Sequence, residues 1–237
     1  MDVDVYTFAR DEEAMLPFFL ANYSYARKII LYDDDSTDRT LKIARADPKV
    51  EIRDANLGYC YDEEAFRQLK NSCWKESDAD WVVVCDIDEF LHHPNFWGQL
   101  LAYREMGITL PKVQGFEMVA EDGLPSLGRN ITDVIVRGVP SQLYSKQAIF
   151  NPRKLREINY VHGAHACVPV GDVVVGGDLK LLHYNMLGGD YIVDRWARRR
   201  ARVSPSAGEQ RWKTFDWGEG RLQEYHARLV EDARLVI

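Results

Sequence analysis

The sequence has no long apolar run, no excess of basic residues and few cysteines, and each shortage excludes a class of protein. No stretch of its 237 residues approaches the roughly 18 consecutive apolar residues of a membrane-spanning helix, so we expect no membrane span. Lys and Arg number 30 against 37 Asp and Glu, a formal charge of −7 that argues against broad nucleic-acid binding. The four cysteines lack the paired spacing of a metal site and favour reduced thiols in the cytoplasm.

What the sequence does contain, in its first 110 residues, is an alternation of strand-like and helix-like segments. The composition, 46% hydrophobic and 28% charged, is that of a globular protein. An alternation of this kind predicts a mostly parallel central sheet flanked by helices, an α/β fold. Strands are expected at residues 3–8, 29–32, 50–52 and 81–85, with apolar residues at helical spacing between them.

The pattern changes after residue 110. Short β-like runs separated by glycine and proline predict a mixed second half, which ends in mostly helical sequence from residue 190 onward. We therefore expect one domain, residues 1–237, composed of a first half, 1–110, and a second half, 111–237. The strands expected in the second half are 112–118, 133–136, 166–170 and 179–183.

The most informative segment, residues 81–90, is an apolar run that ends in two carboxylates. Because side chains alternate along a strand, Asp86 and Asp88 can project to one side while Ile87 points into the packing layer. Mg²⁺ and Mn²⁺ prefer oxygen ligands, and a protein that supplies one or two carboxylates leaves the other positions to substrate phosphates and water. The segment predicts a divalent cation site for a phosphorylated ligand. The alternative is that the chain merely surfaces there into a polar turn.

A second acidic cluster, residues 33–38, follows the second expected strand. Ser36 could cap the next helix, with Asp38 in its first turn, but capping needs only one such residue. Carboxylates at a strand end can also accept hydrogen bonds from a nucleobase or from ribose hydroxyls. In open parallel sheets ligands bind beyond the carboxyl ends of the strands, where both acidic clusters fall.

Three motifs together resemble those of family-2-type glycosyltransferases. Residues 33–38 (DDDSTD) resemble their Asp-Asp-Gly-Ser-Thr-Asp motif, residues 86–90 (DIDEF) their Asp-x-Asp element, and residues 10–12 (RDE) the Arg-Asn-Glu after their first strand. The resemblance implies a glycosyltransferase A fold with a Rossmann-like central sheet, a nucleotide-sugar donor bound by the first half, and Mn²⁺ or Mg²⁺. Asp35 stands where glycine is usual, and Asp11 where asparagine is usual.

The resemblance also implies roles for single residues. Asp34 would bind the base, Asp86 would face the ribose or the metal, and Asp88 would ligate the metal directly. His183 would complete the metal site from the second half, with His162 and His165 as alternatives. The other residues expected near the donor are Arg10, Asp11, Arg67, Asn71, Arg198 and Lys213. For Arg67 and Asn71 the alternative is a solvated helix face.

The second half is expected to bind the acceptor and supply the remaining chemistry. A basic run contains Arg195, Arg198, Arg199, Arg200 and Arg202. Some of these are expected to clamp the departing diphosphate, and most of them to form an exposed helix face. An inverting transfer needs a carboxylate base, and the sequence does not choose among Glu117, Glu121, Asp122 and Asp190.

The resemblance implies a UDP-sugar donor and a glycan, glycoprotein or glycolipid acceptor. Trp212, Phe215 and Trp217 are candidates for a stacking platform or lid, the alternative being that they are core residues. Two other functions fit parts of the pattern. In a haloacid-dehalogenase-type phosphohydrolase, Asp86 would form an aspartyl phosphate. A catalytically idle nucleotide- or glycan-binding module would share the same binding residues.

Overall fold

The computed structural model describes residues 1–58, 62–188, 190–202 and 217–237, apart from the side chain of His162. Its first sheet has five strands, of which the first four in chain order are parallel and the last is antiparallel to its neighbour. The predicted order of alternating strands and helices is confirmed. In spatial order the strands are β3 (Val50–Asp54), β2 (Lys28–Asp33), β1 (Val3–Ala9), β4 (Trp81–Val84) and β8 (Ile149–Phe150).

Helices cover both faces of this sheet, which explains why its inner strands are buried on both faces and mostly apolar. Val3 and Val5 of β1 point to the face covered by α1 (Leu16–Asn22) and α2 (Thr40–Ala44). Phe8 points to the opposite face, where its ring meets Phe66 of α3 (Glu63–Ser72) edge-on at a centroid distance of 5.0 Å. The alternation of side chains along β1 therefore serves two packed layers.

The second sheet is mixed, as the sequence predicts. Its long central strands, β6 (Leu110–Ala120) and β11 (Val175–Leu187), are parallel to each other. They are flanked by antiparallel neighbours: β5 (Glu89–His92) beside β11, and β7 (Arg137–Pro140), which pairs in turn with β12 (Arg234–Leu235), beside β6. Residues 85–88 connect β4 of the first sheet directly to β5 of the second.

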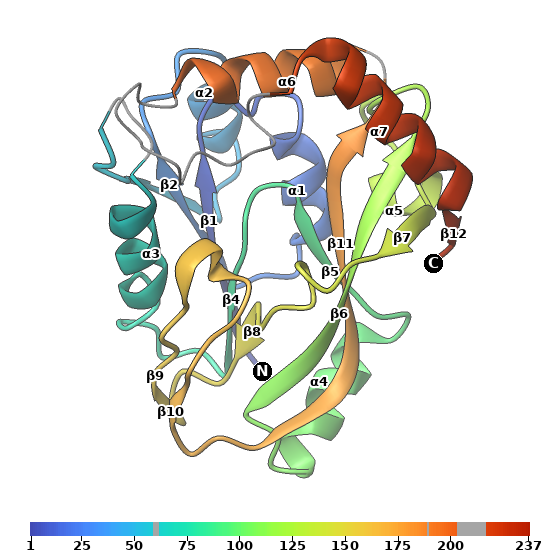
Figure 1. The fold of residues 1–237 in the computed structure, drawn as a ribbon. Coiled ribbons are helices and arrows are strands. Elements are labelled where there is room, and N and C mark those ends of the chain that lie inside the picture. The colour runs from blue at the N-terminus through green and yellow to red at the C-terminus, as the bar shows by residue number, and fades with distance from the viewer. Residues whose placement is uncertain (59–61, 189, 203–216) are drawn as a thin grey trace.

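The remaining elements enclose the ends of the two sheets (Figure 1). Helices α6 (Asp190–Ala201) and α7 (Glu219–Asp232) run along the top of the view, where the arrowheads of β6 and β11 point. Helix α4 (Phe96–Glu105) lies at the bottom. A small ribbon pairs β9 (Leu155–Glu157) with β10 (Val170–Gly171), and the 3₁₀ turn η1 (His162–Ala164) lies between them in the chain.

Two of the expected strands differ from those observed. The strand expected at 133–136 is wrong, because this region forms α5 (Ile131–Val134). Ile131, Val134 and Ile135 have the i, i+3, i+4 spacing of a helix face, and the Ile135 amide donates to the Ile131 carbonyl at 2.8 Å. The strand expected at 166–170 is reduced to β10, since Pro169 has no amide hydrogen for a ladder.

Candidate functional site

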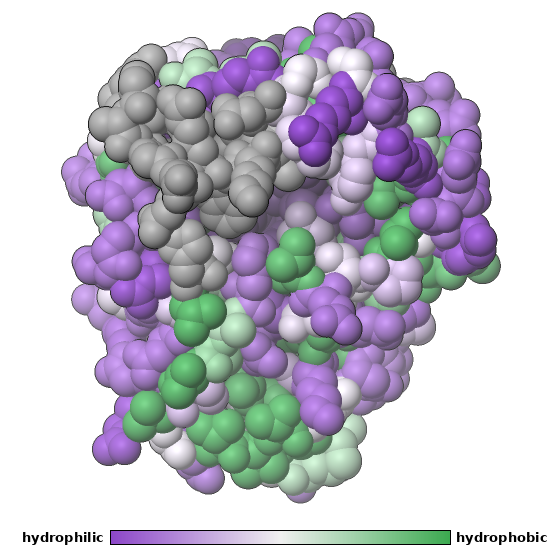
Figure 2. Space-filling model, viewed as in Figure 1, coloured by the Kyte–Doolittle hydropathy of each residue, from purple (hydrophilic) through white to green (hydrophobic). Residues whose placement is uncertain are grey.

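A cavity of about 670 Å³ opens where the two sheets meet, beyond the carboxyl ends of β1, β2 and β4. Figure 2 shows a hollow near the centre of this face. Asp34 follows β2 and Asp86 follows β4, so the two acidic clusters line the same cavity, as the sequence predicts. The opposite wall comes from the second half of the chain and includes Glu117, His183 and the arginines of α6.

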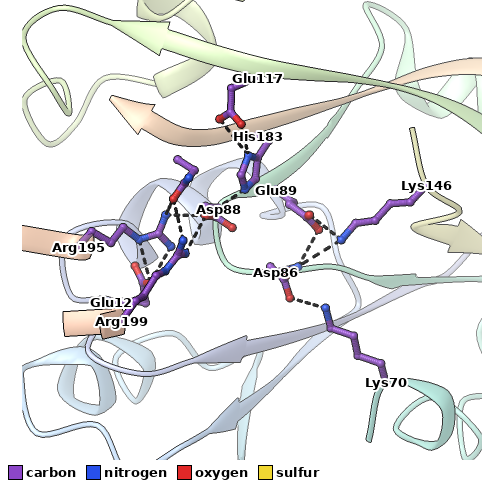
Figure 3. Close-up of polar contacts among 11 residues, drawn as sticks. Glu12, Lys70, Asp86, Asp88, Glu89, Glu117, Lys146, His183, Arg195 and Arg199 are labelled. Atoms are coloured by element: carbon purple, nitrogen blue, oxygen red, sulfur yellow. Dashed lines mark hydrogen bonds and ion pairs between the residues drawn. The ribbon is translucent and has the colours of Figure 1, made fainter. Parts of the chain in front are cut away.

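Asp88 is the buried centre of the site (Figure 3). Its Oδ2 accepts a hydrogen bond from Nη1 of Arg195 at 2.5 Å and lies 3.4 Å from Nη2 of Arg199. Nε2 of His183 lies 3.3 Å from the same oxygen. Burial opposes ionisation, but the facing Arg195 and His183 outweigh it and hold the pKa of Asp88 well below its usual range. Asp88 is therefore a carboxylate at neutral pH.

His183 lies between two carboxylates. The strand register places His183 of β11 opposite Glu117 of β6, and its Nδ1 lies 3.0 and 3.1 Å from the two Glu117 oxygens. The ring of Tyr144 stacks on the imidazole at a centroid distance of 3.8 Å. Burial alone would lower the pKa of His183, yet Glu117 and Asp88 raise it to about 10. The imidazole is thus fixed in orientation by contacts on both ring nitrogens and on its face.

Asp86 faces a different set of partners. Its Oδ1 accepts from Nζ of Lys70 at 2.7 Å, and its Oδ2 lies 3.7 Å from Nζ of Lys146. Lys146 also contacts the buried Glu89 at 2.6 Å, and Glu89 accepts from the Asp86 amide at 3.0 Å. Burial raises the pKa of Asp86, but the two lysines outweigh that effect and lower the pKa to about 2. This carboxylate, too, is ionised.

The loop of residues 141–148, here the crossing loop, brings Tyr144 and Lys146 to the site. It passes directly over β6 at Gly115, whose carbonyl accepts from the Ser141 amide at 2.9 Å and whose amide donates to Oγ of Ser145 at 2.9 Å. A Cβ atom on Gly115 would lie 2.1 Å from the carbonyl carbon of Tyr144. Only glycine permits this approach of two backbones.

We expect the Gly115→Ala substitution to lower the free energy of unfolding by about 1–3 kcal/mol, because the added methyl group would clash with the backbone of Tyr144 and displace the crossing loop away from β6. Chemical denaturation measures the effect. The matched control is Gly220→Ala in α7, where a Cβ would meet nothing within 4 Å and stability should be unchanged or slightly raised. Equal stability of the two variants would contradict a close crossing at Gly115.

Two aspartates in the loops after β1 and β2 have a left-handed backbone conformation. Asp11 has φ of 52° and Asp35 has φ of 58°, a region that aspartate tolerates better than most residues other than glycine. Asp35 can therefore stand where the resembling family has glycine. Oδ1 of Asp11 accepts from the amides of Thr37 and Asp38 at 2.6 and 3.2 Å. Asp11 thus holds the loop that carries Asp34.

Three arginines of α6 and one just after it line the acidic cavity. Arg195 binds Oε1 of Glu12 at 2.7 Å in addition to Asp88, and Arg202 binds the carboxylate of Asp34. Arg10 lies 3.7 Å from the same Asp34 oxygen. The expectation that most of the basic run forms an exposed face is wrong, because Arg195 is buried and Arg199 and Arg202 are half-buried against the cavity, while only Arg198 and Arg200 are exposed. Arg195, Arg198, Arg199 and Arg202 all line the cavity.

The other predicted residues are distributed unevenly around the cavity. Of the carboxylates proposed as a general base, Glu117 lines it, whereas Glu121, Asp122 and Asp190 are exposed and are not among its lining residues. Arg67 and His165 also line it. Asn71 instead binds the backbone of Tyr160, whose amide donates to Oδ1 at 2.7 Å. Trp217 is in the lining, while Trp212, Lys213, Phe215 and the His162 side chain lie outside the described residues.

Several site residues were missed by the sequence reasoning. Lys70 lies four residues after Phe66 on the inner face of a helix whose spacing was visible in the sequence. Asn185, whose Oδ1 accepts from Arg195 at 3.0 Å and Arg199 at 2.9 Å, follows His183 by two positions on the same strand. Lys146 carries no local signal, since only tertiary contacts bring it to Glu89.

The described residues contain no ready-made metal cluster, in the sense of three or more His, Cys, Asp or Glu side chains that could hold an ion. The structure brings Asp88 and His183 together, whereas the Asp86 carboxylate contacts Lys70. Of the three predicted metal ligands, Asp88 and His183 are therefore in contact, whereas Asp86 lies apart from them with different partners.

Comparison with known proteins gives one family match. Residues 7–110 match the model of Glycosyl transferase family 2, a stretch that runs from β1 to the start of β6 and includes both acidic clusters. No curated protein sequence matches the chain.

Among solved structures, glucosyl-3-phosphoglycerate synthase from Mycobacterium tuberculosis, crystallised with Mn²⁺, UDP and phosphoglyceric acid, has a TM-score of 0.45 and 18% identity, with 78% of this chain and 71% of that chain covered. TarS residues 1–349 from S. aureus have a TM-score of 0.41 and 11% identity, with 98% and 71% covered.

Proposed function

We propose that this protein is a metal-dependent glycosyltransferase that moves a sugar from a UDP-sugar to an acceptor. The observation that carries the proposal is the contact of Asp88, which lies within the segment that matches the family 2 glycosyltransferase model, with His183, which in turn contacts Glu117. The match also includes the Asp34 loop, for which a phosphohydrolase would have no use. This favours a transferase over the haloacid-dehalogenase alternative.

The chemistry of the donor set fits a divalent cation. A histidine that ligates a metal usually donates its other ring N–H to a carboxylate, and Glu117 occupies that position on Nδ1 of His183. Asp88 and His183, whose facing atoms lie 3.3 Å apart, would be the residues that hold the ion, and the carboxylate and imidazole are ligand types that Mn²⁺ and Mg²⁺ sites use. Mn²⁺ or Mg²⁺ held by Asp88 and His183, with Asp86 nearby, would help to neutralise the departing diphosphate.

Arg195 and Arg199 of α6, with Arg202 just after the helix, would bind the diphosphate. Guanidinium groups form bidentate contacts with phosphate oxygens, and Arg195, Arg199 and Arg202 already face the cavity. In this structure they are paired with Asp88, Glu12 and Asp34. A nucleotide diphosphate would therefore compete with these carboxylates for the same cations. Of the four carboxylates considered for the general base, Glu117 alone lines the cavity, but both of its oxygens contact Nδ1 of His183, and we assign it to orienting that histidine.

The proposal is tested by nucleotide release. The protein is incubated with Mn²⁺ and a panel of nucleotide sugars, because a glycosyltransferase can hydrolyse its true donor slowly without an acceptor. Release of UDP from one donor, lost on chelation and restored by Mn²⁺, is the expected result. Silence across the panel, with phosphate released from a simple phosphate ester, would replace the proposal with the phosphohydrolase. Tight binding of UDP-sugars without release on addition of acceptors would replace it with the binding module.

A pH dependence of metal binding follows from the environment of His183. A metal needs the neutral imidazole, but Glu117 and Asp88 raise the pKa of His183 to about 10, so at neutral pH the ion must displace a proton. We expect the apparent Mn²⁺ affinity to increase up to about tenfold per pH unit between about pH 6 and pH 8. Titration calorimetry measures it.

The His183→Gln variant should bind Mn²⁺ more weakly and should lose this slope. The matched control is His93→Gln, because His93 is not among the cavity lining residues. An affinity of the unsubstituted protein that does not change with pH would remove His183 from the proposed metal site.

A further inference from the structure

The imidazole of His165 lies in the wall of the cavity, at the tip of the hairpin between β9 and β10. The hairpin tip, residues 163–165, lines the cavity together with Leu143 and Tyr144 of the crossing loop. The ring centroid of Tyr144 lies 6.2 Å from that of His165 and 3.8 Å from that of His183. A single aromatic ring therefore separates His165 from the histidine proposed to hold the cation.

The backbone of the hairpin tip is anchored and strained. The Gly163 amide donates to Oε1 of Glu63 on α3 at 2.6 Å, and the Ala164 amide donates to the Val161 carbonyl at 2.8 Å. Gly163 and Ala164 both have a left-handed backbone, with φ of 73° and 53°. This conformation costs about 1–2 kcal/mol for a residue such as alanine, and strain of this kind gathers at functional sites. Strained backbone thus places His165 in the cavity wall.

A hydrogen bond determines which ring nitrogen of His165 carries the proton. Nδ1 lies 2.8 Å from the carbonyl oxygen of Leu143. Because a carbonyl oxygen can only accept, Nδ1 is the donor. In the neutral ring, Nε2 then holds the lone pair. His165 therefore contributes a basic nitrogen on a ring whose orientation is fixed.

Burial and Lys146 keep the imidazole of His165 neutral. Both lower its pKa from the usual value of 6.5, and they outweigh the Leu143 carbonyl, Glu89 and Asp86, which act in the opposite direction. Cys167 of the same hairpin is a neutral thiol, because burial raises its pKa to about 11. The other ionisable groups that the described structure places against the hairpin are Glu63, Arg67 and Tyr144. At neutral pH, His165 is therefore an uncharged base.

The carboxylates of the cavity are less suited to accept a proton. Among the described lining residues, the carboxylates paired with arginine or lysine are Glu12, Asp34, Asp86, Asp88 and Glu89. A cation beside a carboxylate lowers its affinity for a proton. Glu117 contacts His183, whereas Asp11 and Glu63 accept from backbone amides. A general base is most effective with a pKa near the operating pH, and this favours His165.

We propose that Nε2 of His165 is the general base of an inverting sugar transfer. This rests on the proposed glycosyltransferase function and adds the residue that activates the acceptor. As the acceptor hydroxyl oxygen bonds to the anomeric carbon, its proton passes to Nε2 of His165. The bond from the anomeric carbon to the diphosphate oxygen breaks, and its electron pair leaves with UDP. The transferred sugar then has the opposite anomeric configuration to the donor.

UDP release into water tests the proposal without a known acceptor, because water also has to lose a proton. At saturating Mn²⁺, kcat/KM for the donor should rise about tenfold per pH unit in acid and become level by about pH 6.5, where His165 is neutral. The His165→Asn variant keeps an N–H donor for the Leu143 carbonyl but has no basic nitrogen. It should release UDP about a hundredfold more slowly or less and lose the acid limb, while its calorimetric affinity for UDP with Mn²⁺ stays unchanged.

Azide distinguishes a base from a merely structural residue. The azide ion is a nucleophile with no proton to lose, so it should restore UDP release in His165→Asn and give a glycosyl azide of inverted configuration. The matched control is His226→Gln. Nε2 of His226 lies 2.9 Å from the Ala120 carbonyl oxygen, but His226 is not among the cavity lining residues, and UDP release should be unchanged.

Three outcomes would overturn the proposal and leave the glycosyltransferase function in place. They are UDP release by His165→Asn as fast as by the unsubstituted protein, a loss of release that azide does not restore, and a glycosyl azide of retained configuration. Failure of the unsubstituted protein to release UDP from any donor would refute the proposed function and the base together.

Discussion

Replacing Asp88 by asparagine is expected to reduce turnover of the UDP-sugar about a thousandfold, equivalent to about 4 kcal/mol of transition-state stabilisation. Asparagine keeps the shape and a carbonyl oxygen that can still accept from Arg195, so the cavity should retain its form. It lacks the charge that a divalent cation needs, and the apparent Mn²⁺ affinity should fall together with turnover. Both quantities are measured on the same protein, by UDP release and by calorimetric titration.

The control for Asp88→Asn is Asp172→Asn. Asp172 is 63% exposed at its side chain and pairs only with Lys154 among the contacts described, so its loss should leave turnover unchanged. Thermal unfolding of Asp172→Asn should resemble that of the unsubstituted protein, whereas Asp88→Asn should unfold at a lower temperature, because Arg195 and His183 lose a buried carboxylate partner. A fully active Asp88→Asn variant would refute both the metal site and the assignment of the two-carboxylate segment.

The second large effect is expected on stability, from Lys146→Met. The side chains of Lys146 and Glu89 are 4% and 1% exposed and lie 2.6 Å apart. Removing the lysine leaves the buried Glu89 carboxylate without its ammonium partner, which typically costs about 3–5 kcal/mol. Chemical denaturation should report a loss of that size. Asp86 also loses a cation at 3.7 Å, so UDP release should fall as well.

Lys154→Met is the matched control for this prediction. Lys154 pairs with Asp172 at 3.2 Å, but the side chains are 52% and 63% exposed, and an exposed pair contributes only about 0–1 kcal/mol. The comparison separates burial from ion pairing as such. A Lys146→Met variant as stable as Lys154→Met would mean that Glu89 finds another partner or takes up a proton.

The sequence predicted the acidic half of the site and missed much of its basic half, for a physical reason. Asp34, Asp86 and Asp88 follow strands, and parallel strands deliver their carboxyl ends to one edge of the sheet. Strand periodicity is a local signal, so these positions could be read from spacing. Lys146 belongs to a loop that reaches Glu89 only because Gly115 lets the chain cross β6. No local pattern encodes such a crossing.

Helix α6 shows the same limit in another form. The arginine spacing indicated a basic helix face but not what that face meets. Its position over the cavity depends on tertiary packing, in which the buried Trp196 and Ile192 contact a cluster that includes Met186 of β11 and Leu222 of α7. Whether the arginine face of α6 meets solvent or the cavity therefore depends on contacts among elements that are far apart in the sequence.

Residues 85–88 connect β4 of the first sheet directly to β5 of the second, so the distance between the Asp86 and Asp88 carboxylates depends on how the two sheets are placed. Asp86 is held by Lys70 of α3, which packs on the first sheet, and by Lys146 of the crossing loop, which is anchored to β6, whereas Asp88 is held by His183 of the second sheet and by Arg195 of α6. The two carboxylates, two residues apart, thus have different partners. A sliding of one sheet against the other would change the separation of the two carboxylates, and a core substitution far from the cavity could alter turnover without touching a single site residue.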